Sequence, residues 1–266
     1  MKASRLLRRL LPALVLVMPA TPALDAQWLK VRLPDTPRSA DGSPNVKAPA
    51  PRTPDGRPDL SGIWRAANNR YIQDLGVDLT GGVPFQPHAA RIYRERLDNN
   101  GLDRPSGKCL PKGVPEGMTI RGYPFKIVQT PKLTLVLYEI FVAYRQIHTD
   151  GRDFSGFAKD PSEVHPAWLG YSIGRWEKDT FVVDTIGVND RTWLDDSGYP
   201  HSDALRITER MRRPEFGRLE IEFTFDDPKM YTRAWSVRIP FELVPDTELL
   251  EYVCENEKDL SHMVGK

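Results

Sequence analysis

The segment from residue 188 to 203 carries the densest group of side chains suited to acid–base chemistry. It holds His201, Asp196 and Trp193 in sixteen residues without a strand pattern. Histidine exchanges protons near neutral pH, and a neighbouring carboxylate can orient its ring or raise its pKa. Long connections in compact domains are often functional. We therefore expect His201 and Asp196 to be catalytic candidates, with Trp193 and Asn189 contacting a ligand.

The same segment also fits a plainer interpretation, in which Asp and Asn serve turn geometry in a solvated loop. An EF-hand is excluded, because Asp190 and Asp195 lack its alternating spacing and terminal Glu. No H-x-H or H-E-x-x-H spacing supports a metal site, so none is predicted. P-loop and G-x-G-x-x-G motifs are missing from the sequence, and no cofactor is predicted.

A second polar group follows the end of a predicted strand. It contains His148, Asp150 and Arg152. Asp150 precedes a glycine, a common turn signal, and a lone strand histidine is more often structural than reactive. We nevertheless predict Asp150 and Arg152 as ligand contacts, because both lie where the predicted strand ends and enters a turn.

Glu209 shares one face of a predicted strand with Leu205, Ile207 and Met211. Successive side chains of a strand point to opposite faces, so this apolar face belongs inside. A buried carboxylate is costly unless it is paired. We expect Glu209 to face inward, paired with an Arg or Tyr of a neighbouring strand, and we count it as a third catalytic candidate.

Two other acidic residues are ambiguous by the same test. Asp184 aligns with Val182, and Glu139 continues an alternating run of leucines, so both could face inward. The alternative places them outside or at strand ends, paired with arginines such as Arg145 or Arg175.

The elements that position these residues are mostly strands. From residue 125 onward the apolar pattern has a period of two, broken by short turns. The predicted strands are 125–130, 133–139, 141–148, 171–176, 179–185, 204–212, 218–225, 231–243 and 248–254. An antiparallel meander of eight to ten strands loses its exposed edges by closing, so we predict a barrel, with a β-sandwich as the alternative. Residues 87–99 predict one helix, packed outside the barrel or across an end.

The N-terminal residues predict export. Residues 1–26 combine four basic residues with a short apolar core, as in a secretory signal peptide. Residues 27–58 are rich in proline and predict an extended segment, and 59–266 predict a single domain. No later apolar run is long enough to span a membrane, so a periplasmic or extracellular protein is expected. With 37 basic and 36 acidic residues, the chain does not resemble a nucleic-acid binder.

Two cysteines, Cys109 and Cys254, are present. In an oxidising compartment an even number favours a disulfide. Metal ligation is the alternative, but neither cysteine lies in a C-x-x-C pair or near a histidine. We predict a Cys109–Cys254 disulfide.

Several motifs together resemble one family. These are SGIW at 61–64, YSIGRWEKDTFVVDT at 171–185, NDRTWLD at 189–195, PHSDAL at 200–205 and TER at 208–210. The combination resembles an uncharacterised family of exported bacterial proteins, over roughly residues 59–255. This resemblance implies a shared fold, with the 189–210 region as its hallmark. A weaker similarity to lipocalin-like barrels rests on Gly62-Ile63-Trp64 near the start of the domain, followed by an antiparallel meander.

Three functions remain open at this point. The first is binding of a small apolar or aromatic molecule in a barrel cavity. The second is a cofactor-independent enzyme (lyase, isomerase or hydrolase) that uses His201, Asp196 or Glu209 in the same cavity. The third is an interaction module of the cell envelope. Convergence of His201, Glu209 and an arginine on one pocket would favour the enzyme.

Overall fold

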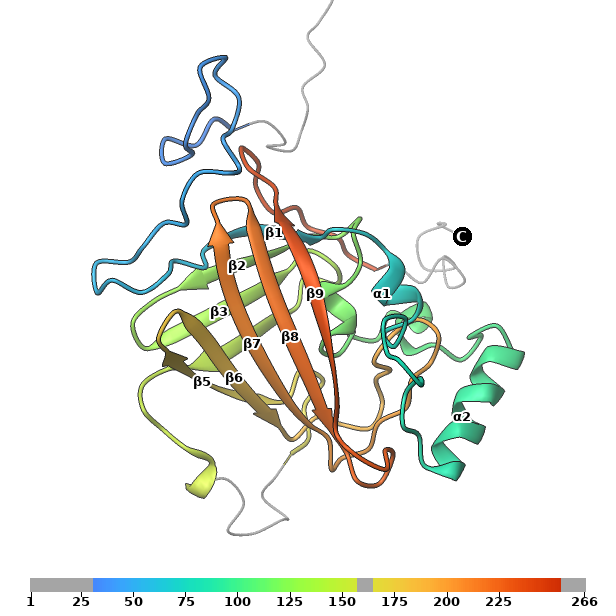
Figure 1. The fold of residues 1–266 in the computed structure, drawn as a ribbon. Helices are drawn as coiled ribbons and strands as arrows, with labels where there is room; N and C mark the ends of the chain where they lie inside the picture. Colours follow the sequence, from blue (N-terminus) through green and yellow to red (C-terminus); the bar gives the residue numbers. More distant parts are fainter. Residues whose placement is uncertain (1–30, 157–164, 255–266) are drawn as a thin grey trace, which may run out of the picture.

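The computed structural model describes residues 31–156 and 165–254; the predicted signal peptide lies outside these ranges. Nine strands form a closed barrel (Figure 1). They are β1 Gly62–Ala66, β2 Phe125–Gln129, β3 Leu133–Tyr138, β4 Tyr144–His148, β5 Tyr171–Glu177, β6 Thr180–Ile186, β7 Arg206–Glu215, β8 Arg218–Asp226 and β9 Trp235–Leu243. The predicted barrel is confirmed.

The expectation that every pair is antiparallel is wrong at one place. β4 and β5 are parallel and share two register pairs, Ile147 with Ser172 and His148 with Ile173. A parallel pair needs a crossover rather than a hairpin. The connection from residue 149 to 170 is long enough to return the chain to the end at which β4 begins.

The strand predicted at 248–254 is also wrong. In that segment Tyr252 forms a single bridge to Ile140, outside the barrel ladder. The ninth strand is β1, which pairs with β2 on one side and with β9 on the other. Barrel closure therefore joins the first strand to the last.

Alternation along β7 and β8 places the predicted apolar faces inside. Leu205, Ile207, Glu209 and Met211 are all buried. On β6 the inward residues are Phe181, Val183 and Thr185, so Asp184 lies outside, where Arg175 contacts it. Glu139 lies beyond the end of β3; it is buried and accepts a hydrogen bond from the Leu250 backbone.

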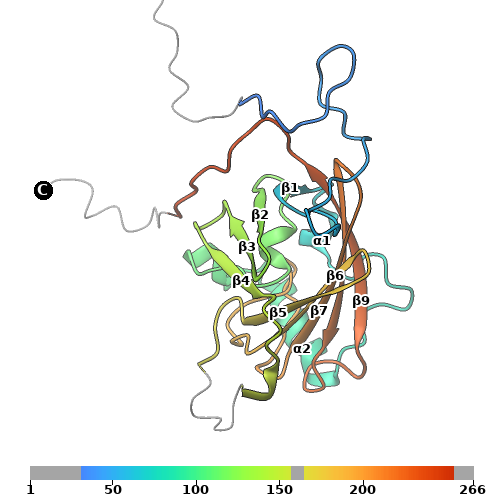
Figure 2. The ribbon, with the colours of Figure 1, turned by 90° about the vertical axis from the view of Figure 1, so that its left-hand side faces the viewer.

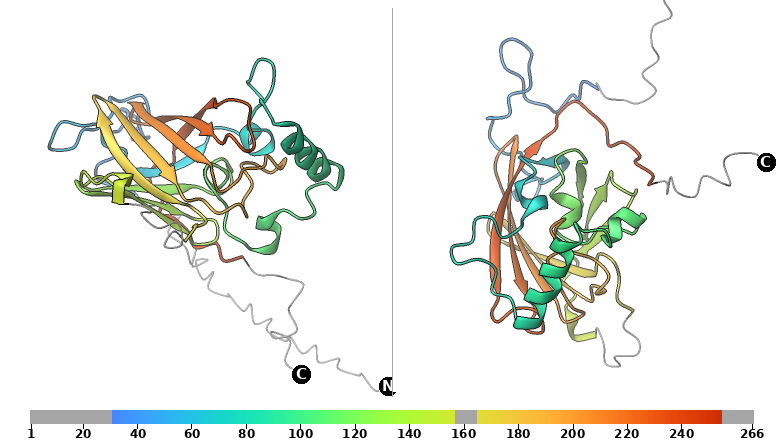
Figure 3. Two further views of the ribbon diagram at one scale, coloured as in Figure 1. Left: turned by 90° about the horizontal axis from the view of Figure 1, so that it is seen from below. Right: turned by 90° about the vertical axis from the view of Figure 1, so that its right-hand side faces the viewer.

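The predicted helix is α2, Pro87–Asp98. Pro87 suits the first turn because its missing N–H has no partner to lose there. Gly101 follows in the left-handed region, with φ +64°, and donates its N–H to the Arg96 carbonyl. Figures 1 and 3 show α2 outside the barrel, beside one end. A shorter helix, α1, covers Arg70–Gln73.

Residues 31–58, here called the arm, lie over the opposite end of the barrel (Figure 2). Pro49 bridges Glu215, and the Phe216 and Gly217 N–H groups donate to Ala48 and Val46. The predicted disulfide between Cys109 and Cys254 is present, across 145 positions of sequence. Among the described residues no helix is long and apolar enough to cross a membrane.

Candidate functional site

The loop predicted to be reactive covers one end of the barrel, here called the closed end. Leu194 and Tyr199 are buried in the main core together with Trp235 of β9. The Tyr231 hydroxyl donates to the Pro200 carbonyl over 2.7 Å. The loop is therefore a packed part of the barrel core.

His201 is buried within this loop, with 4% of its surface exposed. Its Nε2 lies 2.7 Å from Thr192 Oγ1, and its Nδ1 lies 3.2 Å from the Ser202 carbonyl. Burial lowers its pKa, and the nearby Arg96 acts in the same direction. Asp196 was expected to raise the pKa of His201 or to fix its tautomer; instead Asp227 and Asp190 are the carboxylates that raise this pKa, and burial outweighs them.

Asp196 and Trp193 point to other partners. Asp196 forms ion pairs with Arg104 at 2.9 Å and with Lys112 at 3.4 Å. Trp193 is buried, and the Arg96 guanidinium of α2 lies 4.5 Å from its ring centre. The interactions of His201, Asp196 and Trp193 thus run in three directions and do not form one reactive cluster.

The remaining predicted contacts lie near the surface. Asn189 accepts the Arg191 N–H through its side chain, in a turn. Arg152 pairs with Asp150 at 2.6 Å and donates to the Tyr171 hydroxyl. The hydrogen bond from Arg152 lowers the pKa of Asp150 to about 2. Asp150 and Arg152 therefore neutralise each other.

Glu209 faces the barrel interior and pairs with an arginine, as predicted. The partner, Arg145, comes from β4, which does not neighbour β7, so the expectation of a partner on a neighbouring strand is wrong. Arg145 also donates to Ser172 Oγ at 2.9 Å and Thr185 Oγ1 at 2.6 Å. Burial raises the pKa of Tyr138, beside this pair, to about 12. The cluster links β4, β5, β6 and β7, but it is only partly satisfied: within the described structure, Arg145 Nη1 and Glu209 Oε1 are buried without a hydrogen-bond partner.

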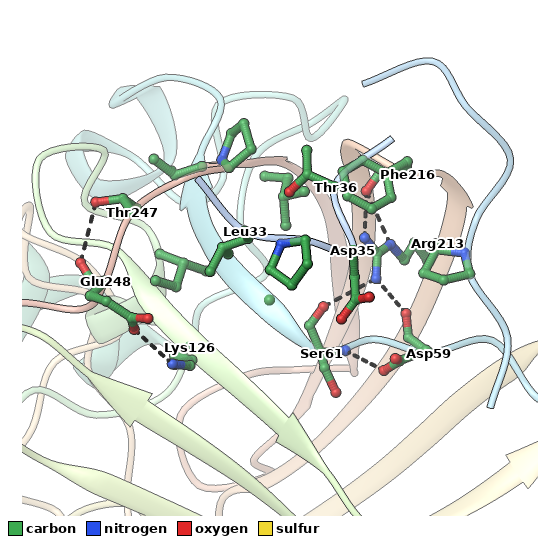
Figure 4. Close-up of a pocket in the computed structure, with 17 residues that line it drawn as sticks. Leu33, Asp35, Thr36, Asp59, Ser61, Lys126, Arg213, Phe216, Thr247 and Glu248 are labelled. Atoms are coloured by element: carbon green, nitrogen blue, oxygen red, sulfur yellow. Dashed lines mark hydrogen bonds and ion pairs between the residues drawn. The ribbon is translucent and has the colours of Figure 1, made fainter. Parts of the chain in front are cut away.

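The other end, here called the arm end, holds a recess of about 350 Å³ between the arm and the barrel (Figure 4). We call it the arm recess. Its apolar lining includes Leu33 and Pro34 from the arm, Ile63 from β1, Phe216 from the β7–β8 turn and Leu243 from β9. Apolar side chains that far apart in sequence surround one space because β1, β7 and β9 all reach this end.

Asp246 ties the arm down beside the recess. Its carboxylate accepts the Leu33 N–H and both terminal nitrogens of Arg38, at 2.5–3.1 Å. Its backbone carbonyl accepts the Val31 N–H. The Arg38 and Asp246 side chains are 20% and 23% exposed, so solvent screens this contact.

Arg213 forms the polar wall of the recess. Its guanidinium donates to the carbonyls of Asp59, Ser61 and Phe216 and lies 4.9 Å from the Trp64 ring centre. Burial lowers its pKa to about 10. Carbonyl oxygens, rather than a carboxylate, hold this buried charge.

Three acidic and two basic side chains line the arm recess. Lys126 pairs with Glu248 at 3.0 Å, and Asp59 accepts the Ser61 N–H. Asp35, on the arm, is exposed. The recess therefore has charged residues around an apolar middle, which suits a molecule with one polar group.

One sequence signal for this site was missed in the prediction. Arg213 follows Glu209 and Met211 in the inward phase of β7, so an unusual buried charge was visible there. Leu33 and Asp246 carry no such signal, because their meeting depends on barrel closure.

The described residues contain no cluster of His, Cys, Asp and Glu suited to a metal. Comparison with family models, curated proteins and solved structures finds no match for this chain.

Proposed function

We propose that this protein is an exported binding protein that holds a small, largely apolar molecule in the arm recess. The observation that carries the proposal is the recess itself, about 350 Å³ with an apolar middle and a few fixed polar groups. Small-molecule sites have this size and this character. The Cys109–Cys254 disulfide supports an oxidising compartment, in line with export.

Binding accounts for the geometry better than proton-transfer catalysis. His201, Asp196 and Glu209 belong to separate hydrogen-bond networks. His201 and Glu209 are buried, with 4% and 0% of their surface exposed, and Asp196 is half-buried. An enzyme needs acid and base on one reacting molecule. The arm recess offers instead an apolar surface with the polar groups Arg213, Ser61 and Asp35 to orient a guest.

The test uses 1-aminoanthracene, a neutral apolar dye whose emission rises when it leaves water. We expect saturable binding to the wild-type protein. Leu33→Asp places a charge in the apolar lining and should weaken binding about tenfold or more. Val77→Asp is the matched control, because Val77 is 40% exposed and lies outside the recess lining.

Equal affinity of the dye for wild-type protein and for Leu33→Asp would refute the assignment. Dye that fails to saturate the wild-type protein would count against the function itself.

A further inference from the structure

A second recess lies in the barrel wall where β4 and β5 separate. Its volume is about 460 Å³, and we call it the seam recess. The two strands meet only at Ile147–Ser172 and His148–Ile173, so the wall opens beyond these pairs. The β3–β4 hairpin tip borders one side of the opening, and residues 167–170 border the other.

The hairpin tip has a strained backbone. Phe141 and Val142 both lie in the left-handed region, with φ +62° and +49°. Turns of this kind normally use Asn or Gly, because a bulky side chain there clashes with the backbone. Each such residue adds strain to the backbone. An Asn-Gly pair would relieve that strain, so turn formation alone does not explain why Phe141 and Val142 occupy these positions.

The strained turn presents apolar side chains to the seam recess. Val142 is 53% exposed and Tyr144 is 63% exposed. Both line the recess together with Phe141. Burying such side chains from water is favourable, and the fold itself leaves them uncovered.

Aromatic surfaces dominate the rest of the lining. The His148 ring stacks on Tyr171, with ring centres 5.2 Å apart and planes 29° apart. Trp168 stands on the other side, and Arg191 lies 4.8 Å from its ring centre. Flat aromatic walls favour a flat aromatic guest, because offset and edge-on ring contacts add to area burial.

The charges of the seam recess favour a neutral guest. Arg145 is the charged residue of its lining, and its guanidinium is buried against Glu209. Burial and the nearby Arg152 lower the pKa of His148, which favours its uncharged ring. No carboxylate side chain stands in the described lining to hold a cation. Gln146 and Tyr144 supply hydrogen-bond donors at the exposed rim.

We propose that the seam recess binds a neutral, planar aromatic molecule that carries a hydrogen-bond acceptor. This site is independent of the arm recess, since the two linings share no residue. Coumarin is a suitable probe, because it is flat and uncharged and its carbonyl accepts a hydrogen bond.

Fluorine NMR of protein labelled with 5-fluorotryptophan reads out the site directly. Trp168→Phe assigns the Trp168 resonance. Coumarin should shift that resonance saturably while leaving the resonances of Trp193 and Trp235 in place, because these two lie outside the lining. A titration that moves several tryptophan resonances together without saturating would overturn the proposal.

Val142→Asn separates the binding role from a structural one. Asn tolerates positive φ, so thermal stability should rise, whereas the lost apolar contact should weaken coumarin about fivefold or more. Val77→Asn, at an exposed position elsewhere, should change neither quantity. Unchanged coumarin affinity in Val142→Asn overturns the proposal. Loss of coumarin binding in Leu33→Asp also overturns it, because coumarin would then bind in the arm recess.

Discussion

An aspartate fixes a connecting segment at each end of the barrel, but the two act in different surroundings. Asp195 at the closed end is fully buried and accepts hydrogen bonds from Leu75, Gly198 and Tyr199 N–H groups and from the Ser197 hydroxyl. Asp246 at the arm end accepts a similar number of hydrogen bonds with 23% of its side chain exposed.

A similar number of hydrogen bonds therefore holds the two segments in place with different strength. Water can replace the partners of Asp246 when the arm moves, but it cannot reach those of Asp195. The closed end is therefore a permanent part of the core, whereas the arm end can open and close at low cost. The ligand proposed for the arm recess would exchange at this end.

Asp195→Ala should have the largest effect. It leaves the Leu75 and Tyr199 N–H groups without an acceptor, whereas the Gly198 N–H keeps the Asp195 backbone carbonyl at 3.3 Å. Each buried N–H left without a partner costs about 1–3 kcal/mol. We expect the free energy of unfolding to fall by about 3 kcal/mol or more, measured by urea denaturation. A loss below about 1 kcal/mol would mean that water reaches these donors after all.

The second-largest effect should be a pH dependence of the free energy of unfolding that comes from the closed end. Burial holds the pKa of His201 below its ordinary 6.5, so the unfolded chain takes up the proton first. Stability from this residue is present above pH 6.5 and is lost as pH falls through the folded-state pKa, by at most about 1.4 kcal/mol per pH unit. His201→Gln should therefore remove this loss of stability between pH 7 and pH 5, as a difference in slope from the wild-type protein. Burial raises the pKa of Asp195 to about 6 and that of Glu116 to about 7, and these carboxyls act in the opposite direction in both proteins.

His88→Gln, at an exposed position of α2, is the control for that slope. A slope in His201→Gln equal to that of the wild-type protein would assign the pH dependence to other groups.

Asp246→Ala should have a small effect on global stability, because the contacts it removes are partly exposed. We expect the arm to loosen instead. Hydrogen exchange at the Val31 and Leu33 N–H groups should accelerate while exchange in β7 and β8 stays slow. If Asp246→Ala destabilises the whole protein as strongly as Asp195→Ala, the contrast between the ends is wrong.

Added salt should give the smallest effect. The Arg52–Asp179 pair, which also holds the arm, has side chains 52% and 64% exposed. Salt screens such pairs and leaves buried ones nearly untouched. Exchange in the arm should speed up slightly with ionic strength, with no change at Gly198 or Tyr199. Equal acceleration at both sets of amides would contradict this difference.

Sequence periodicity was sufficient for the features that depend on one strand at a time. The inward phase of Ile207, Glu209 and Met211 follows from alternation alone. Asp184 could not be placed, because Val182 and Val183 make both faces of β6 apolar. The partner of Glu209 depends on how β4 is brought near β7, which local pattern does not encode.

The candidate sites were harder to predict for the same reason. The His201 partner, Thr192, depends on the path of a loop without periodicity. Both recesses are formed by segments that meet only after the barrel closes, such as Leu33 with Leu243. The prediction therefore found the reactive residue types and placed the ligand at the closed end, whereas the function proposed above places it at the arm end.

The pairing of β1 with β9 also constrains when the protein can fold. Arg65 on β1 contacts Glu242 on β9 across 177 positions of sequence. During synthesis, β1 emerges early and cannot find its final neighbour until almost the whole described chain has followed. Contacts this distant in sequence slow folding and leave a strand edge open to foreign partners in the meantime. A protein with this topology benefits from being held unfolded until its last strand is available.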